Sequence, residues 1–229
     1  MADTEFRYGF KGQIHGLNPE VQAFNSRISN EQSLMEKILR ERIYESQYWK
    51  EFCVPLNAAT LCDQAVQLKY IGGQYSNIHP TEFICLVFKL LQIQPEREII
   101  MEYLQAEEFK YLLSNGATNS CRYLQALAMF YIRLTFPGVE CYQILEPFLN
   151  DYRKLRHRSQ TGFRLTFIDE YVDSLLHDER VCDVALPRIP TRFALEEVEE
   201  LEPRVSLLGG EIDSEEDGNT EGTDSDDER

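Results

Sequence analysis

The residues of this chain that could bind a metal or act as a nucleophile are its four histidines and six cysteines. A zinc site or a zinc-dependent hydrolase needs ligands at short spacings such as Cys-x-x-Cys or His-Glu-x-x-His, and neither pattern occurs. The histidines lie far apart in the chain, at His15, His79, His157 and His177. We therefore predict no metal, no cofactor and no catalytic residue. A cryptic hydrolase that combines one cysteine with a distant histidine stays open as an alternative.

The cysteines are scattered singly, and most lie among apolar neighbours in segments with helical spacing. They are Cys53, Cys62, Cys85, Cys121, Cys141 and Cys182. In a reducing compartment this arrangement indicates buried thiols rather than disulfides. The pair Gly72 and Gly73 lacks the neighbouring residues of a phosphate-binding loop, and we expect it to end a helix.

A predicted helix near the N-terminus carries charges on its apolar face. On a wheel of about 100° per residue, Ile38, Trp49 and Phe52 share a sector with Arg42 and Glu45. Trp49 is the only tryptophan, and the two charged residues are three apart, so they can pair. Two interpretations stay open: an ion pair at the margin of the core, or part of a groove for a partner helix.

A basic cluster lies in the middle of the chain, at Arg153, Lys154, Arg156 and Arg158. Such a cluster can contact RNA phosphates or serve as a nuclear import signal. The alternative is a solvated helix end, where cations meet the negative end of the helix dipole. A direct RNA-binding protein that uses this cluster is therefore the alternative function.

The acidic residues concentrate at the C-terminus. The net charge is −16, and residues 196–229 contribute −13 of it, because they contain 15 acidic and two basic residues. A nearly neutral body with an acidic tail disfavours strong direct binding to RNA. In the tail, Ser214 and Ser225 are each followed three residues later by an acid, a pattern that suits an acid-directed kinase. The N-terminus lacks the features of a secretory signal and no segment has the length of a membrane span, so we expect an intracellular protein without membrane contact.

Apolar spacing, capping residues and prolines predict an all-α protein with a single compact multi-helix domain. Helices are expected over residues 30–54, 57–71, 80–94, 95–112 (either continuous or broken near residue 106), 123–134, 139–152, 168–177 and 193–201. The alternation of residues 163–167 predicts one short β-hairpin near residues 160–167. The expected organisation is an irregular N-terminal arm at 1–30, the helical domain at 31–203 and a disordered acidic tail at 204–229.

Four blocks of sequence carry a resemblance to a known family. They are RIYESQYWKE at residues 42–51, YIGGQYSNIHPTEFICLVFKLLQIQPE at 70–96, LEPFLNDYRK at 145–154 and IDEYVDSLLHDERVCDVALPR at 168–188. These blocks, in this order, resemble the pre-mRNA-splicing factor 38 family, and the resemblance extends over about residues 16–203. Two features depart from the family: a polar insert at 114–121, and an acidic tail where some members carry a long Arg/Ser-rich extension.

The resemblance implies a non-enzymatic, all-helical scaffold of the spliceosome in the nucleus. It implies association with the tri-snRNP, a requirement in spliceosome activation, and recruitment of other splicing proteins through helical segments. The implied partners are a zinc-finger splicing protein, a microfibrillar-associated-protein-like factor and tri-snRNP components. RNA contact would then be indirect, and the protein would be a monomer within a large complex.

Two groups of residues are our candidates for partner contacts. The first group, expected to line or support a groove, is Arg42, Glu45, Tyr48 and Trp49. The second group, expected on another contact surface, is Asp178, Glu179, Arg180 and Asp183.

Overall fold

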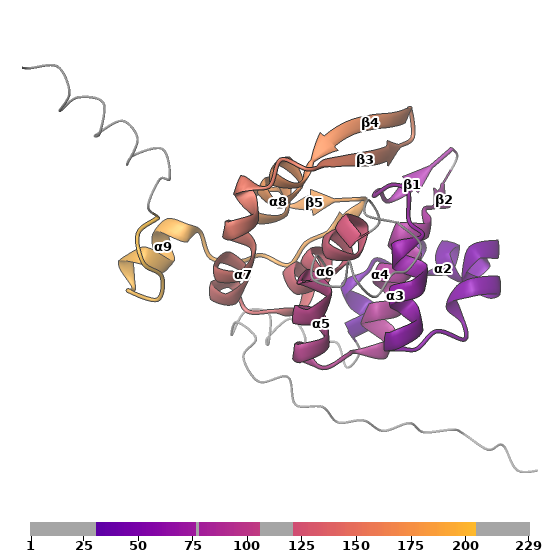
Figure 1. Cartoon of the computed structure of the whole chain (residues 1–229), viewed down its shortest axis with the longest axis horizontal. Helices are drawn as coiled ribbons and strands as arrows, with labels where there is room; N and C mark the ends of the chain where they lie inside the picture. The colour runs from indigo at the N-terminus through magenta and orange to yellow at the C-terminus, as the bar shows by residue number, and fades with distance from the viewer. Residues whose placement is uncertain (1–30, 77, 106–120, 205–229) are drawn as a thin grey trace, which may run out of the picture. The chain divides into compact units, whose positions relative to one another are not determined.

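The computed structural model describes residues 31–76, 78–105 and 121–204 (Figure 1). It confirms a mostly helical fold with a few short hairpins. The chain forms two compact units, Met1–Pro190 and Thr191–Arg229. The predicted arm at 1–30, most of the acidic tail and the insert before Cys121 lie outside the described residues, and the predicted domain limits stay predictions.

Two almost fully buried helices form the core of the first unit. They are α4 (Glu82–Ile93) and α6 (Cys121–Thr135). Helix α6 packs against α4, α3 (Ala58–Val66), α5 (Arg97–Leu104) and α8 (Ile168–His177) (Figure 1). Phe83 and Phe130 meet edge to face at the α4–α6 contact, with ring centroids 6.0 Å apart. Each such buried side chain stabilises the fold by about 1.5–3 kcal/mol.

The N-terminal segment is not the single helix predicted over 30–54. A 3₁₀ turn (η1, Glu31–Leu34) and a short α-helix (α2, Lys37–Glu45) come first. The backbone then extends at Ser46 (ψ 143°) and continues into a π-helical turn (η2, Trp49–Cys53). Because this break changes the helical phase, Leu39 and Ile43 are buried together with Trp49, whereas Ile38 and Phe52 are exposed.

Local signals placed several other helices well. Asn57 caps α3 through a reciprocal hydrogen-bond pair with Thr60, as its position before an apolar run predicted. Helix α8 has the predicted bounds. Helix α7 (Gly138–Leu145) gives way to a 3₁₀ turn (η4, Glu146–Asn150) that contains Pro147. In the second unit, Thr191 caps the short helix α9 (Arg192–Glu197).

Three antiparallel hairpins accompany the helices. The longest pairs β3 (Lys154–Ser159) with β4 (Gly162–Phe167), which confirms the predicted hairpin and extends it to residue 154. The basic cluster therefore lies mainly on a strand, and the helix-end interpretation was wrong. The other hairpins join β1 (Gln74–Tyr75) to β2 (His79–Pro80), and β5 (Arg180–Val181) to β6 (Val184–Ala185).

Gly72 and Gly73 do not end a helix, because α3 already stops at Val66. They belong to a strap between α3 and β1 that passes between two hairpins. Next to them, Ile71 bonds to β3, donating to the Arg156 carbonyl and accepting from the Arg158 amide, both at 2.8 Å. A Cβ on Gly72 would lie 2.3 Å from the Arg158 carbonyl oxygen, and one on Gly73 would lie 2.1 Å from the Cys182 carbonyl oxygen. Glycine is required here because backbone meets backbone.

The cysteines are free, and all are buried except the half-buried Cys62. Burial raises the pKa of Cys85, Cys141 and Cys182 to about 12. A thiol with such a pKa carries almost no thiolate at neutral pH, so these three residues are poor nucleophiles. Within the described ranges, no cluster of potential ligands could hold a metal ion, and no helix is long and apolar enough to cross a membrane.

The close packing of the strap predicts that a methyl group at Gly73 strongly destabilises the fold. We expect Gly73→Ala to lower the free energy of unfolding by about 2 kcal/mol or more, because the Cys182 carbonyl cannot move away without distorting β5–β6. Gly162→Ala is the comparison, since Gly162 has a positive φ (134°) but open space around a new Cβ. Urea unfolding of both variants measures the difference, and a smaller loss for Gly73→Ala would contradict the close-contact argument.

The thiols predict an order of reactivity. In the native protein at pH 8, a small alkylating reagent should label Cys62 before Cys53, Cys85, Cys141 and Cys182, since burial is least complete at Cys62. Its pKa is also raised by burial, so even Cys62 should react more slowly than a free cysteine. Mass spectrometry of labelled peptides over time checks this order. Early labelling of a core cysteine would show that the packing is looser than described.

Candidate functional site

A chain of polar contacts runs from α2 to β5–β6 across the strap. The Asp183 carboxylate accepts a hydrogen bond from the Gln74 amide at 2.8 Å. The Gln74 side chain accepts one from Arg42. At the other end, Arg180 forms an ion pair with Glu36 and donates to the Asp183 carbonyl at 3.1 Å. The two predicted contact groups, one around Arg42 and one around Asp183, are therefore joined through Gln74.

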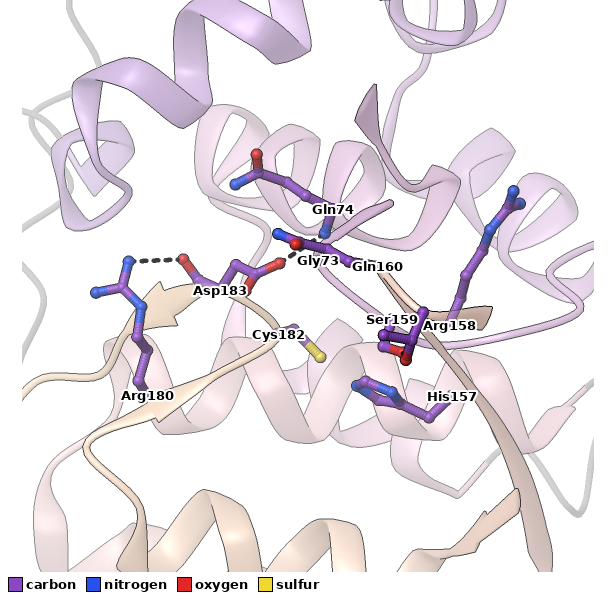
Figure 2. Close-up of a pocket in the computed structure, with 10 residues that line it drawn as sticks. Gly73, Gln74, His157, Arg158, Ser159, Gln160, Arg180, Cys182 and Asp183 are labelled. Atoms are coloured by element: carbon purple, nitrogen blue, oxygen red, sulfur yellow. Dashed lines mark hydrogen bonds between the residues drawn. The ribbon is translucent and has the colours of Figure 1, made fainter. Parts of the chain in front are cut away.

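A pocket of about 350 Å³ opens beside this network. Figure 2 shows Asp183 between Arg180 and Gln74, with His157 and Arg158 contributed by β3. Most of the residues that line the pocket are of polar type: Gly73, Gln74, His157, Arg158, Ser159, Gln160, Thr161, Arg180, Cys182 and Asp183. Burial and the nearby Arg164 lower the pKa of His157, although Asp183 opposes the shift. The pocket marks the place where three hairpins and the strap converge.

The residues of the first predicted group lie in different environments. Trp49 is 5% exposed and packs on Phe88, with ring centroids 5.2 Å apart, so it supports α2 from inside the core. Tyr48 is half-buried, burial raises its pKa, and its ring lies 5.4 Å from that of Phe52. Glu45 is exposed. In the described part of the chain it forms no ion pair with Arg42, which bonds to Gln74 instead.

Three apolar side chains on α2, on the π-turn that packs against it and directly after that turn are exposed. Ile38 is 61% exposed, Phe52 45% and Val54 58%. We call these three residues the α2 apolar patch. The helical wheel placed Ile38 and Phe52 in the buried stripe, and it failed because a continuous α-helix was assumed through Ser46. The patch was therefore missed at the sequence level.

The second predicted group is split between the network and the solvent. Arg180 and Asp183 hold the network together, and Asp183 lies in the turn of β5–β6 with a positive φ of 62°. Asp178 follows the end of α8 and lines a second, smaller pocket of about 180 Å³. Glu179 is exposed, and its carbonyl accepts from the Leu186 amide at 2.9 Å.

The basic cluster divides into anchored and free cations. Arg153 forms an ion pair with Asp151 and donates to Gln125 at 2.8 Å. Burial acts to raise the pKa of Asp151, but the hydrogen bonds and charge of Arg153 outweigh it, and the net pKa is lowered. The Arg158 guanidinium lies 3.5 Å from the ring centre of Tyr75. Lys154 and Arg156 are exposed on β3.

The remaining predicted site residues, Ser214 and Ser225, lie outside the described residues.

Comparisons with known proteins identify the family. The family model described as "PRP38 family" matches residues 25–199. Pre-mRNA-splicing factor 38A of Xenopus tropicalis is 48% identical over 202 residues, which cover 87% of this chain and 57% of that protein. The Homo sapiens protein of the same name is 47% identical with the same coverage. Pre-mRNA-splicing factor 38 of Drosophila melanogaster is 46% identical over 204 residues, 88% of this chain and 54% of that protein.

These relatives are longer than this chain, which spans little more than half of their length. A solved structure agrees with them: the crystal structure of the Snu23-Prp38-MFAP1(217-258) complex of Chaetomium thermophilum. One of its chains matches with a TM-score of 0.72 and 42% identity, over 83% of this chain and 96% of that one. The sequence match and the fold match together show that this chain belongs to the PRP38 family, the family of pre-mRNA-splicing factor 38.

Proposed function

We propose that this protein is a non-catalytic protein-interaction scaffold of the spliceosome, and that the α2 apolar patch docks helical segments of other splicing proteins. The observation that carries the proposal is the exposure of Ile38, Phe52 and Val54, together with Arg42, which lies one turn from Ile38 on α2 and is held in place by Gln74. Helix-in-groove recognition uses such apolar anchors, flanked by fixed polar groups that set the orientation of the partner.

The family relationship supports the spliceosomal setting. A protein that shares this fold at 42% identity was crystallised with Snu23 and MFAP1(217-258), so we assign a zinc-finger splicing protein and a microfibrillar-associated-protein-like factor as partners. In this proposal the protein acts in the nucleus, associates with the tri-snRNP as a monomer within a large complex, and contributes to spliceosome activation.

The polar network gives the second predicted group a supporting role. Arg180 and Asp183 tie α2 and β1 to β5–β6, so they hold the surface around the patch in one geometry. Asp178 and Glu179 stay candidates for direct contact because both are exposed. A non-enzymatic role is supported by the high pKa values of the buried thiols, which remove the cysteines of the core from the list of nucleophiles.

Purification from nuclear extract tests the proposed setting. The full chain, and a form that lacks residues 204–229, should both recover tri-snRNP and activation-stage splicing proteins at moderate and at high salt. The reason is that apolar contacts resist salt, whereas contacts of a charged tail do not. Mass spectrometry and RNA sequencing of the eluates provide the readout. Recovery of salt-labile RNA without those proteins would overturn the scaffold proposal.

A second experiment addresses the patch itself. The double substitution Ile38→Ser with Phe52→Ser should weaken binding of a microfibrillar-associated protein segment at least tenfold in isothermal titration calorimetry, a change of about 1.4 kcal/mol. Stability should change little, because both side chains already face water in the free protein.

The control is Phe193→Ser, which removes an exposed phenylalanine (68%, against 45% for Phe52) from the second unit and should leave the affinity unchanged. If the double variant binds the segment as tightly as the unaltered chain, the patch is not the docking site.

A further inference from the structure

The β3–β4 hairpin presents two different faces. Leu155 and Thr166 are cross-strand neighbours and both are buried, so their side of the hairpin faces the core. Side chains alternate along a strand, so residues one position away point outward. The outward face carries cations on β3 and apolar side chains on β4, as the cross-strand pairs Lys154–Phe167, Arg156–Leu165 and Arg158–Phe163.

The apolar row is exposed although it is large. Phe163 is 57% exposed and Leu165 58%. Two guanidinium groups lie over the Phe163 ring, with that of Arg156 5.5 Å and that of Arg158 5.2 Å from the ring centroid. Tyr70, on the strap beside β3, meets the same ring edge to face at 5.5 Å and accepts a hydrogen bond from Arg158. Phe163 is thus held in place by three neighbouring side chains, while more than half of the residue's surface stays exposed to solvent.

Within the described residues, the exposed cations of this face, Lys154 and Arg156, have no carboxylate partner. Elsewhere in the molecule arginines pair with carboxylates, as Arg153 does with Asp151 and Arg180 with Glu36. Across residues 31–76, 78–105 and 121–204, neither Lys154 nor Arg156 forms an ion pair. Alternate residues on a strand are about 6.7 Å apart, so the cations form a regular row next to an aromatic ring.

We propose that the outward face of β3–β4 binds single-stranded RNA, with phosphates on Lys154 and Arg156 and an unpaired base stacked on Phe163. A row of cations beside an open, immobilised ring is the combination that single-strand binding requires, since phosphates need charge and bases need a flat surface. An acidic peptide would satisfy the cations but would leave the ring without a stacking partner.

This inference goes beyond the scaffold function and revises the sequence-based alternative. The four-residue basic cluster is not the unit that binds. Arg153 is committed to Asp151, Arg158 is committed to Tyr70 and Tyr75 and positions Phe163, and Phe163 was not part of the prediction. Two free cations and one ring imply weak binding, which fits an RNA already brought near by the surrounding complex.

Fluorescence anisotropy with a labelled 12-nucleotide oligouridylate and the full chain tests the proposal. For the unaltered chain, the logarithm of affinity should fall with the logarithm of salt with a slope of about −1.4, from two phosphate contacts. The double substitution Lys154→Ala with Arg156→Ala should remove this salt dependence and weaken binding at least tenfold at 50 mM salt. Phe163→Leu should weaken binding about fivefold or more without changing the slope, because stacking is lost and charge is kept.

Two matched controls separate the face from charge and from folding. Arg164→Ala removes a cation from the opposite face of the same hairpin and should change the affinity less than twofold. Phe163→Tyr keeps a ring and should restore most of the affinity lost in Phe163→Leu. Thermal unfolding of each variant checks that the hairpin remains folded.

Several results would overturn the proposal. The first is that the unaltered chain does not bind the RNA at 50 mM salt. The second is that Arg164→Ala lowers the affinity as much as the double variant does. The third is that substitution of Phe163 leaves the affinity unchanged. A polyglutamate peptide that binds with the same dependence on Lys154, Arg156 and Phe163, where RNA does not, would assign the face to an acidic protein partner instead.

Discussion

The close approach of backbone to backbone at Gly72 and Gly73 is the constraint on which the surfaces of this protein depend. Carbonyl oxygens of Arg158 and Cys182 occupy the places where side chains would otherwise project. Two hairpins that are distant in sequence are thereby brought to one strap, with β3–β4 on one side and β5–β6 on the other. The Asp183–Gln74–Arg42 contacts, the Tyr70–Arg158–Phe163 cluster and the pocket in Figure 2 all form around this junction.

The core and the surface network contribute differently to this protein: the core to its stability, the network to its surface geometry. Helices α4 and α6 bury nearly all of their side chains and supply the stability, which leaves little there for recognition. The surface network contributes mainly geometry. The Glu36–Arg180 pair is about half exposed on both sides, and such pairs contribute only about 0–1 kcal/mol. Its effect is to hold α2, and the apolar patch on it, against β5–β6.

Sequence reasoning predicted what local signals determine. The start of α3 and the apolar periods of residues 123–134 and 168–177 were predicted correctly, because caps and amphipathic spacing act within a few residues. Sequence reasoning failed where contacts between distant parts of the chain determine the local structure. Contacts with segments far away in the chain determine three features: the helix break at Ser46, the need for glycine at Gly72 and Gly73, and the hydrogen-bond partner of Arg42. Of the candidate contact residues, Trp49 lies in the core, and Phe163 was not among the candidates.

The long sequence separations in the surface network have a consequence for biosynthesis. Asp183 bonds to Gln74, 109 positions earlier, and Arg180 pairs with Glu36, 144 positions earlier. Chains are synthesised from the N-terminus, and early segments can fold first. Helix α2 therefore emerges from the ribosome long before the strands that hold it in position. The patch on α2 acquires its final setting only when residue 183 has been added, so a nascent or truncated chain presents the anchors without their supporting frame.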